Sequence, residues 1–376
     1  MTDHRKRKQE HIEICLTEKV EPGCTGFNHY SLLPEAFPEM GLDHVDTAVS
    51  LLGRRLAFPF VIGAMSGGTG GDFDLNHRLA RVAQKTGVAL ALGSMRPALT
   101  DGRFRKEYDV RSLAPDIPLF GNISAWQLRD AGIRQGLLDL CAELQLDGLF
   151  VHVNAAQELV QPEGERDFSG ALEAVLALLD QTKLPIFLKD VGTGLATEHL
   201  AELVDAGIAG LDVAGRGGTN WPLVETLRRD DGPGQALGRE LAGFGLPTAT
   251  VLRRVDARLQ ELTGPGDTLS RKQPPDRPWL IASGGLRTPT EMALAIGLGA
   301  DLVSAARPLL AAAAASEESL AQTLNHYHKG LRCLMLLSGC RSLEKLRSRV
   351  VPSDPRMHVH IPNTGRQSGD TSTTHT

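Results

Sequence analysis

The sequence predicts an α/β protein of the TIM (β/α)8 barrel class, and three observations support that prediction. The chain of 376 residues is long enough for one large domain with extensions. Short apolar runs alternate with segments of helical period, which is the pattern of repeated β/α units. Each run is followed by a glycine, a hydroxyl, an amide or a cation. Polar residues at every strand end indicate a closed ring around one ligand, because an open sheet concentrates its site at one switch point.

Eight apolar runs are the expected barrel strands. They are Phe60–Ala64, Val88–Leu92, 119–120 with neighbours, Leu149–Val153, Ile186–Leu188, Leu211–Ala214, Leu280–Ala282 and Leu302–Ala305. Apolar residues recur at helical spacing in four segments between them, which are Leu75–Lys85, Gly170–Gln181, Glu198–Ala206 and Thr290–Leu298. We expect Thr197 and Thr288 to be N-caps, the second with Pro289 at the first helical position.

Three parts of the chain extend the barrel, which is expected over residues 59–350. Residues 1–58 form an N-terminal extension. The segment 230–278 is long for a connection after strand 6 and contains an expected helix, Thr248–Leu262, so we expect an insertion over the barrel mouth. Residues 351–376 are a polar tail that we expect to be disordered.

Composition excludes several classes of protein. The formal net charge of −5 does not support a nucleic-acid partner. The basic run Arg5-Lys6-Arg7-Lys8 could be a solvated tail, a nucleic-acid arm or an anion-binding flap. The five cysteines form no C-x-x-C pair, which argues against a zinc finger and a disulfide framework and favours reduced thiols in the cytoplasm. We expect no secretory signal and no transmembrane helix, because no apolar stretch has the required length.

The strand Leu149–Val153 leads into a cluster of four polar groups. His152, Asn154, Gln157 and Glu158 stand at or just after its carboxyl end, where parallel α/β proteins place their chemistry. An ordinary loop with a helix cap is the simpler interpretation. Four adjacent groups with hydrogen-bonding or metal-binding capacity favour a functional site.

Two other strand ends indicate a phosphate-bearing cofactor. Gly284-Gly285 and Ala305-Ala306 follow the seventh and eighth strands, where backbone N–H groups of barrels commonly hold phosphate. Lys189 closes an apolar strand, and it could pair with Asp190, form a Schiff base, or lie against an electron-rich ring. The hydroxyls and amides after the other strands favour a flat ring such as flavin.

The motifs together resemble a known family. They are Arg7-Lys8-x-x-His11-Ile12, Ala64-Met65-Ser66-Gly67-Gly68, Gly93-Ser94-Met95-Arg96, His152-x-Asn154-x-x-Gln157-Glu158, Lys189-Asp190-Val191-Gly192, Gly217-Gly218-Thr219-Asn220-Trp221 and Ser283-Gly284-Gly285-Leu286-Arg287-Thr288. From about residue 5 to 350 the chain resembles the type 2, flavin-dependent isopentenyl-diphosphate isomerases. It departs from the usual family pattern at three places: Ser66 stands for Thr, Asp190 for Glu, and Ala155-Ala156 for Pro-Leu. The last change could loosen the loop that carries Gln157.

The resemblance implies an activity and its cofactors. Isopentenyl and dimethylallyl diphosphates would be interconverted by a 1,3-proton shift, with reduced FMN as acid and base, Mg²⁺ on the diphosphate and NADPH as the flavin reductant. Gln157 has no useful acid–base pKa, so the flavin, through a ring nitrogen such as N5, would carry the proton while Gln157 positions the alkene or relays a proton. Which group removes the C2 proton stays open. The family also implies a homotetramer or homooctamer.

The resemblance assigns roles to residues. The expected FMN contacts are Ala64, Met65, Ser66, Ser94, Asn122, Lys189, Thr219, Gly284, Gly285, Ala305 and Ala306. The expected substrate contacts are Arg7, Lys8, Ser94, Arg96, His152, Asn154 and Gln157, which makes the basic run a flap over the substrate, with Arg5 and Lys6 solvated. Glu158 is the expected Mg²⁺ ligand. Trp221 and Glu225 could wall the flavin pocket, or be a packed Trp and an exposed Glu.

Two other functions remain open. An FMN-dependent 2-hydroxy-acid oxidase or dehydrogenase would need a histidine base and arginines for a carboxylate. A flavin-binding redox sensor would bind FMN without turnover. The arrangement of Arg7, Lys8, Gln157 and Glu158 favours a diphosphate and a metal over either alternative.

Overall fold

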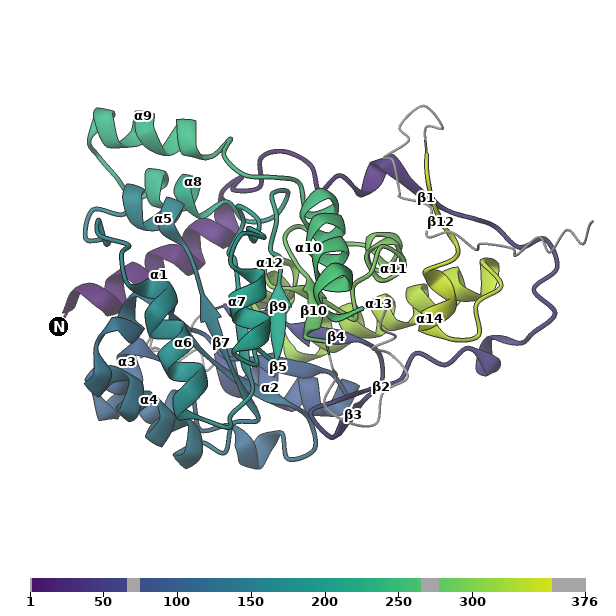
Figure 1. Cartoon of the computed structure of the whole chain (residues 1–376), viewed down its shortest axis with the longest axis horizontal. Coiled ribbons are helices and arrows are strands. Elements are labelled where there is room, and N and C mark those ends of the chain that lie inside the picture. Colours follow the sequence, from purple (N-terminus) through teal and green to yellow (C-terminus); the bar gives the residue numbers. More distant parts are fainter. Residues whose placement is uncertain (1, 66–74, 265–276, 354–376) are drawn as a thin grey trace, which may run out of the picture.

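The central feature of the structure is a closed parallel barrel. The computed structural model describes residues 2–65, 75–264 and 277–353 (Figure 1). The barrel strands follow the order β10-β11-β4-β5-β6-β7-β8-β9 and close on themselves. Their bounds are β4 Phe60–Ile62, β5 Ala89–Ala91, β6 Leu119–Ser124, β7 Gly148–His152, β8 Ile186–Lys189, β9 Gly210–Asp212, β10 Trp279–Ala282 and β11 Leu302–Ala305. All eight expected strands are present, so the predicted barrel is confirmed.

Helices surround the barrel or cover its mouth. Their bounds are α1 Thr2–Thr17, α2 Leu75–Thr86, α3 Arg96–Thr100, α4 Ala131–Glu143, α5 Ala155–Val160, α6 Ala171–Gln181, α7 Leu200–Asp205, α8 Trp221–Leu227, α9 Gly232–Leu241, α10 Thr248–Thr263, α11 Pro289–Gly297, α12 Arg307–Ala315, α13 Glu317–Leu337 and α14 Leu343–Leu346. Short 3-10 helices are η1 Phe27–His29, η2 Leu42–His44, η3 Gly102–Glu107, η4 Arg111–Leu113 and η5 Ala125–Arg129. The described part of the chain contains no helix that is long and apolar enough to cross a membrane.

A hairpin of the N-terminal extension fills one end of the barrel. Strands β2 (Val49–Leu51) and β3 (Arg54–Leu56) pair antiparallel, and their apolar residues join one buried cluster with the inward-facing barrel residues. Phe120, Phe150 and Phe187 meet at the centre of this cluster with ring centroids 5.0–5.4 Å apart. Side chains therefore fill the barrel interior, and the open end is the one at the carboxyl ends of the strands.

The two ends of the described chain are tied together outside the barrel. Strand β1 (Tyr30–Leu32) pairs antiparallel with β12 (Val350–Pro352). Val351 and Pro352 are thus part of a strand, so the predicted tail begins too early, because these residues find hydrogen-bonding partners far away in the sequence. The rest of the predicted tail, residues 354–376, lies outside the described residues.

The expected insertion divides into parts with different neighbours. Helix α9 packs on α8 and α5, whereas α10 packs on α7 and β10. Figure 1 shows α9 at the end of the molecule near α5 and α1, with α10 alongside the barrel. The two helices of this segment therefore lie against different parts of the molecule, and its placement over the barrel mouth stays a prediction. Residues 265–276 of this segment are not among those described.

Helix caps agree with the sequence at one of the two expected positions. Thr288 caps α11 through a capping box, in which its hydroxyl accepts a hydrogen bond from the Glu291 N–H. The prediction for Thr197 is wrong, because α7 begins at Leu200 after His199. Residues 198–199 form a turn in which the Leu200 N–H donates to the Thr197 carbonyl (3.3 Å), so the N-cap is His199, two residues after Thr197.

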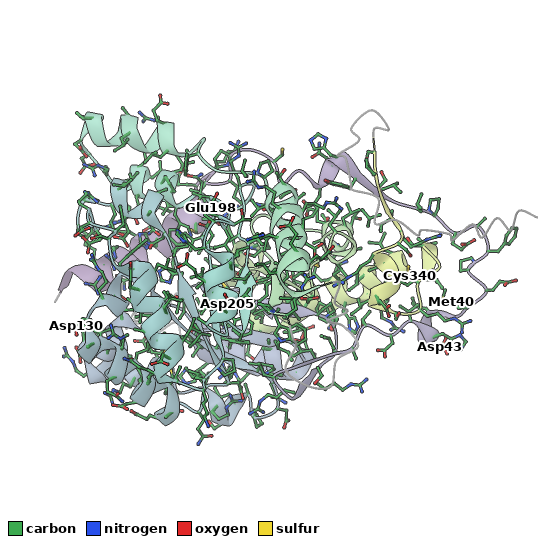
Figure 2. The ribbon with its side chains drawn as sticks, in the orientation of Figure 1. Met40, Asp43, Asp130, Glu198, Asp205 and Cys340 are labelled. Carbon is green, nitrogen blue, oxygen red and sulfur yellow. The ribbon has the colours of Figure 1, made fainter. Side chains whose placement is uncertain are left out.

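All five cysteines of the chain are free in the structure. Cys15, Cys141 and Cys340 are buried, Cys333 is half-buried and Cys24 is exposed. Cys340 lies at the end of α13, in the part of the molecule that also carries Met40 and Asp43 (Figure 2). Burial in apolar surroundings raises the pKa of Cys141 to about 12, so this thiol stays protonated and inert.

Truncating the barrel's aromatic centre tests the importance of its packing. Phe150→Ala should lower the free energy of unfolding by about 3–5 kcal/mol, because it leaves a cavity between Phe120 and Phe187. The measurement is urea unfolding of the flavin-free protein followed by circular dichroism. Phe37→Ala is the matched control, since Phe37 is 82% exposed and should change the value by less than about 0.5 kcal/mol. Equal effects of the two changes would contradict the packing argument.

Candidate active site

One large cavity lies at the carboxyl ends of the barrel strands. Its volume is about 1440 Å³, which exceeds the roughly 300–1,000 Å³ of an ordinary small-molecule pocket and leaves room for two ligands. Every predicted site residue that the structure describes lines this cavity. These are Arg7, Lys8, Ala64, Met65, Ser94, Arg96, Asn122, His152, Asn154, Gln157, Glu158, Lys189, Thr219, Gly284, Gly285, Ala305 and Ala306. The remaining one, Ser66, lies outside the described residues.

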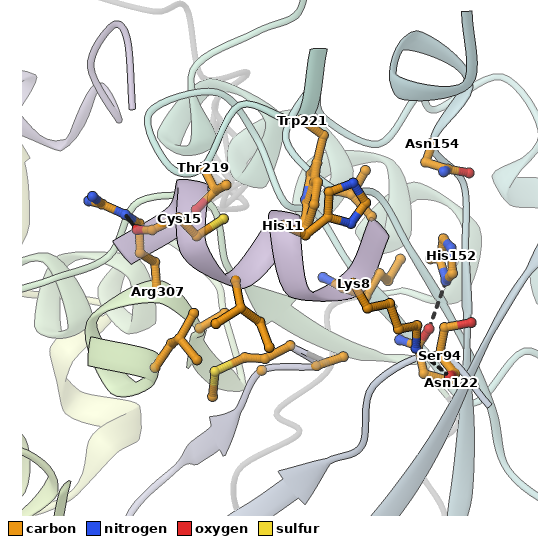
Figure 3. A pocket seen from close by; sticks show the side chains of 18 of the residues that line it. Lys8, His11, Cys15, Ser94, Asn122, His152, Asn154, Thr219, Trp221 and Arg307 are labelled. Carbon is orange, nitrogen blue, oxygen red and sulfur yellow. Dashed lines mark hydrogen bonds between the residues drawn. The ribbon is translucent and has the colours of Figure 1, made fainter. Parts of the chain in front are cut away.

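The N-terminal helix α1 lies across the cavity. Lys8, His11 and Cys15 project from it toward the site (Figure 3), and they line the cavity. Arg307, at the start of α12, holds this helix by donating from Nε to the Cys15 carbonyl (2.6 Å) and from its Nη2 to the Glu18 carbonyl (3.0 Å). The Lys6 side chain is 77% exposed, as expected of a solvated residue. The basic run is thus part of a helix that covers the site.

Three cations gather at one end of the cavity. Lys8 donates to the Ser94 carbonyl (3.2 Å), and burial together with the nearby Arg7 lowers its pKa to about 7. Burial and Arg7 likewise lower the pKa of Arg96, which the Glu158 carboxylate opposes. Cations that depress one another's pKa in a buried place are stabilised when an anion joins them. This end of the cavity is therefore suited to an anionic ligand such as a diphosphate.

His152 lies beside this cation cluster as a neutral ring. Burial, with the charges of Lys189 and Lys8, lowers its pKa to about 3. Its Nδ1 lies 2.7 Å from Asn122 Oδ1 (Figure 3), an acceptor, so Nδ1 carries the ring proton and Nε2 carries a lone pair. A donor role toward phosphate would need the other tautomer, and it stays a prediction.

Asn154 organises the polar cluster after β7. Its Oδ1 accepts from Trp126 Nε1 (2.9 Å). Its Nδ2 donates to Gln157 Oε1 (3.2 Å) and to Glu158 Oε1 (3.0 Å), both on α5. Both hydrogens of the Asn154 amide are thus donated to side chains on α5, so Asn154 orients Gln157 and Glu158. Its predicted contact with phosphate stays a prediction.

Glu225 is the buried partner of Gln157. Its side chain is fully buried, and its Oε1 accepts from Gln157 Nε2 and lies against His11 Nε2, each at 2.8 Å. Burial raises the pKa of this carboxyl, but the bonds from His11 and Gln157 and the charge of Arg228 bring it below its usual range. Neither predicted place for Glu225 is right, because Glu225 is neither exposed nor part of the cavity wall. Trp221 does line the cavity, in edge-on contact with the His11 ring.

Glu158 presents a single carboxylate to the cavity. Its Oε2 accepts from the Glu165 backbone N–H (2.8 Å), which fixes the group at the cavity edge. The described residues contain no group of three or more His, Cys, Asp or Glu side chains that could hold a metal. A Mg²⁺ ion here would take one carboxylate oxygen and complete its shell with phosphate oxygens and water, as this ion commonly does.

Lys189 pairs with the Asp212 carboxylate, whereas the sequence offered Asp190 as one possible partner. Its Nζ donates to Asp212 Oδ2 (2.8 Å), and Ser283 Oγ donates to Asp212 Oδ1 (2.5 Å). Asp190 instead accepts from the backbone N–H groups of Gly192, Thr193 and Gly194 and orders the loop after β8. The Asp190 alternative is therefore wrong, since Asp190 points into its own loop. An ion pair favours an ammonium over the free amine that a Schiff base requires.

The glycine pair after β10 is required by the contact of two loops. Gly284 and Gly285 have φ values of +93° and +90°, and an added Cβ would lie 2.2 Å from the Gly215 carbonyl and 2.4 Å from the Gly217 carbonyl. Glycine is thus required here because the loop after β9 packs too closely to leave room for a Cβ atom. Together with Ala305-Ala306 and the N-terminus of α12, this pair lines the cavity where a phosphate would find backbone N–H groups.

The donor set suits a flavin. The Lys189 ammonium, the Asn122 amide and the hydroxyls of Ser94 and Thr219 line one cavity, together with the loops that carry Gly284-Gly285 and Ala305-Ala306. A flavin mononucleotide has a heteroatom-rich ring edge for the former and one phosphate for the latter. The described residues therefore fit FMN.

Comparison with known proteins defines the class of protein. A family described as FMN-dependent dehydrogenase matches residues 152–353, more than half of the chain. Mandelate oxidase with (S)-2-phenylpropionate is similar with a TM-score of 0.61 and 19% identity, over 93% of this chain and 98% of that one. Mandelate oxidase with 3,3-difluoro-2-hydroxy-3-phenylpropionic acid also gives 0.61, with 18% identity and the same shares. The structural likeness shows the barrel fold of the FMN-dependent class.

Sequence relatives narrow the class to one family. The isopentenyl-diphosphate delta-isomerase of Paracoccus zeaxanthinifaciens is 39% identical over 344 residues, which is 91% of this chain and 95% of the relative. That of Rickettsia africae is 37% identical over 342 residues, with the same shares. The chain belongs to the isopentenyl-diphosphate delta-isomerase family, which confirms the resemblance inferred from the motifs.

Sequence reasoning missed the roles of His11 and Asp212 and misplaced Glu225. His11 was part of a matching motif but had no role, although it contacts both Trp221 and Glu225. Asp212 stands inside an expected strand, and an acidic residue in an apolar run is a signal that could have revealed it. Glu225 has no such signal, because its partners come from α1 and α5, far away in the sequence.

The lowered pKa of Lys8 predicts proton uptake when an anion binds. At pH 8 the amine is largely neutral, and inorganic pyrophosphate should restore its charge, so binding should take up about one proton at Lys8. Calorimetry in two buffers of different ionisation enthalpy measures this number. Lys8→Arg should bind pyrophosphate without that proton, because arginine stays charged, and Lys6→Arg is the exposed control. Equal uptake by wild type and Lys8→Arg would contradict the assignment.

Proposed function

We propose that this protein interconverts isopentenyl and dimethylallyl diphosphates by a 1,3-proton shift, with FMN and Mg²⁺ bound in the cavity. The observation that supports this most is the pairing of two anion-binding ends in one cavity. The cations Arg7, Lys8 and Arg96 and the glycine pair with α12 line the same cavity, and Figure 3 shows Lys8 and Arg307, which begins α12, on opposite sides of it. Gln157 lines the same cavity. Names of relatives at 37–39% identity point to the same substrates.

The reaction sets clear demands on the site. A proton must be added to the terminal carbon of an unactivated alkene, and another must leave C2, while the developing tertiary cation is kept from water. Reduced FMN, when bound, supplies a ring nitrogen that can donate and accept a proton. The chain's own residues must bind the diphosphate, orient the alkene and exclude water.

Gln157 is suited to orienting the alkene. Its amide is fixed at both ends, since Oε1 accepts from Asn154 and Nε2 donates to Glu225. A primary amide without a useful pKa cannot protonate an alkene unaided, but a fixed amide can hold a reacting group in place. Trp221 and helix α1 wall this region, which helps to exclude water.

Glu158 and the cation cluster are suited to holding the diphosphate. Glu158 would supply the protein ligand of Mg²⁺, and the metal would bridge to the phosphate oxygens. Arg7, Lys8 and Arg96 would donate charge-assisted hydrogen bonds to the same group. A homotetrameric or homooctameric assembly, a cytoplasmic location and NADPH as the reductant are proposed from the family resemblance alone.

The redox state of the flavin provides the main test of this function. Protein with oxidised FMN should be nearly inactive, and NADPH or dithionite should switch on isomerisation without stoichiometric consumption, because the net reaction transfers no electrons. The measurement is conversion of isopentenyl diphosphate under anaerobic conditions, beside the flavin spectrum. Full activity of flavin-free protein would refute the proposal. Oxidation of mandelate or lactate without isomerisation would favour a 2-hydroxy-acid oxidase, and FMN binding without any turnover would favour a redox sensor.

Two substitutions should separate orientation from metal binding. Gln157→Asn should retain FMN and lower kcat on the order of 10²-fold, because a shorter side chain misplaces the amide by about a bond length. Glu158→Gln should instead weaken the apparent Mg²⁺ affinity by roughly 10–100-fold or more. Steady-state rates over a range of Mg²⁺ concentrations distinguish the two. An unchanged Mg²⁺ dependence in Glu158→Gln would remove this residue as the ligand.

A further inference from the structure

The ion pair between Lys189 and Asp212 joins two neighbouring barrel strands. These residues end β8 and β9 and are aligned partners in the parallel sheet. Lys189 Nζ lies 2.8 Å from Asp212 Oδ2, and Ser283, which follows β10, donates to Asp212 Oδ1 at 2.5 Å. Lys189 and Ser283 line the cavity, whereas Asp212 is 2% exposed and stands behind them. Asp212 therefore contacts residues that line the cavity and does not itself line it.

We propose that Asp212 is a positioning residue that offsets the charge of Lys189 and thereby sets the reduction potential of the bound flavin. This inference rests on the proposed function and on the expected contact between Lys189 and FMN, taken to be at the N1–C2 edge of the ring. A cation at that edge stabilises the negative charge that the ring gains on reduction. A carboxylate in contact with the cation opposes that effect, and burial leaves the opposition poorly screened by solvent.

Compensation of the Lys189 charge by Asp212 would suit an isomerase. Its net reaction moves protons and transfers no electrons, so the reduced flavin must keep its protons available. An uncompensated Lys189 would favour loss of the N1 proton and formation of anionic reduced flavin. The pair of Lys189 and Asp212 carries no net charge while retaining the ammonium as a hydrogen-bond donor. Such a site would keep the reduced flavin neutral more readily than a lone lysine would.

The main experiment measures the reduction potential of the FMN-bound protein. Asp212→Asn keeps the size of the side chain and removes its charge, so the potential should become more positive. We expect a change of about tenfold in the reduction equilibrium constant, which is about 30 mV for a two-electron couple. Spectrophotometric titration of the reduced protein should also show the N1 proton lost at lower pH. Asp212→Glu retains the charge and should stay close to the wild-type potential.

A double-mutant cycle tests whether Asp212 acts through Lys189. In a Lys189→Met background, Asp212→Asn should raise the potential much less, because a buried carboxyl without its cation is costly in the charged form and would carry little charge for the substitution to remove. A merely structural role would not give this dependence on Lys189. If Asp212→Asn does not fold, Ser283→Ala provides the second test. It leaves the carboxylate with one donor fewer, so more of its charge acts on Lys189 and the potential should fall.

Two results would overturn the inference. One is FMN-bound Asp212→Asn with an unchanged potential, and the other is an equal shift with and without Lys189. An unchanged or higher potential in Ser283→Ala would likewise contradict it. Failure of the proposed function gives a different result, because wild-type protein would then bind no FMN or would bind it without isomerising. The reduction potentials of the FMN-bound variants test the role of Asp212 independently of isomerase activity.

Discussion

Closure of the parallel barrel is the constraint on which the rest of the structure depends. Strand β11 pairs with β4, so the first and last strands of the barrel become neighbours. All eight strands run in one direction, and their carboxyl ends therefore meet at one rim. Residues from Arg7 to Arg307 reach a single cavity for this reason. The hairpin β2–β3 fills the opposite end, which leaves the chemistry at one end only.

Buried charges are a second theme of the molecule, and each is accommodated by partners from distant segments. Glu225 is held by Gln157, His11 and Arg228, and Asp212 by Lys189 and Ser283. Away from the cavity, Asp301 accepts from the Leu280 N–H and pairs with Arg347, while burial raises its pKa to about 6. A buried charge without such partners would be costly. At the site, the same pairing orients Gln157 and fixes the Lys189 ammonium.

Local sequence signals predicted where strands and helix caps lie better than they predicted which side chains contact one another. Each expected strand is present because a strand buried on both faces reads as a continuous apolar run. Thr288 was recognisable as a cap from the adjacent Pro289, whereas Thr197 lacked such a neighbour. Asp190 was one possible partner of Lys189 from the sequence, but alternation along a strand directs Asp190 away from Lys189, while Asp212 lies directly across on β9. Adjacency in sequence was a poor guide to contact.

The sequence by itself determined the barrel, the family and many of the residues that line the cavity. Apolar runs, polar strand ends and ordered motifs are all local patterns, and a chain of such patterns can be interpreted without coordinates. Only the tertiary structure decided which side chains touch. It placed α1 across the cavity, buried Glu225 behind Gln157 and brought Asp212 to Lys189. The physical reason is that hydrogen bonds and ion pairs act over about 3 Å, and only the packing of distant segments fixes distances on that scale.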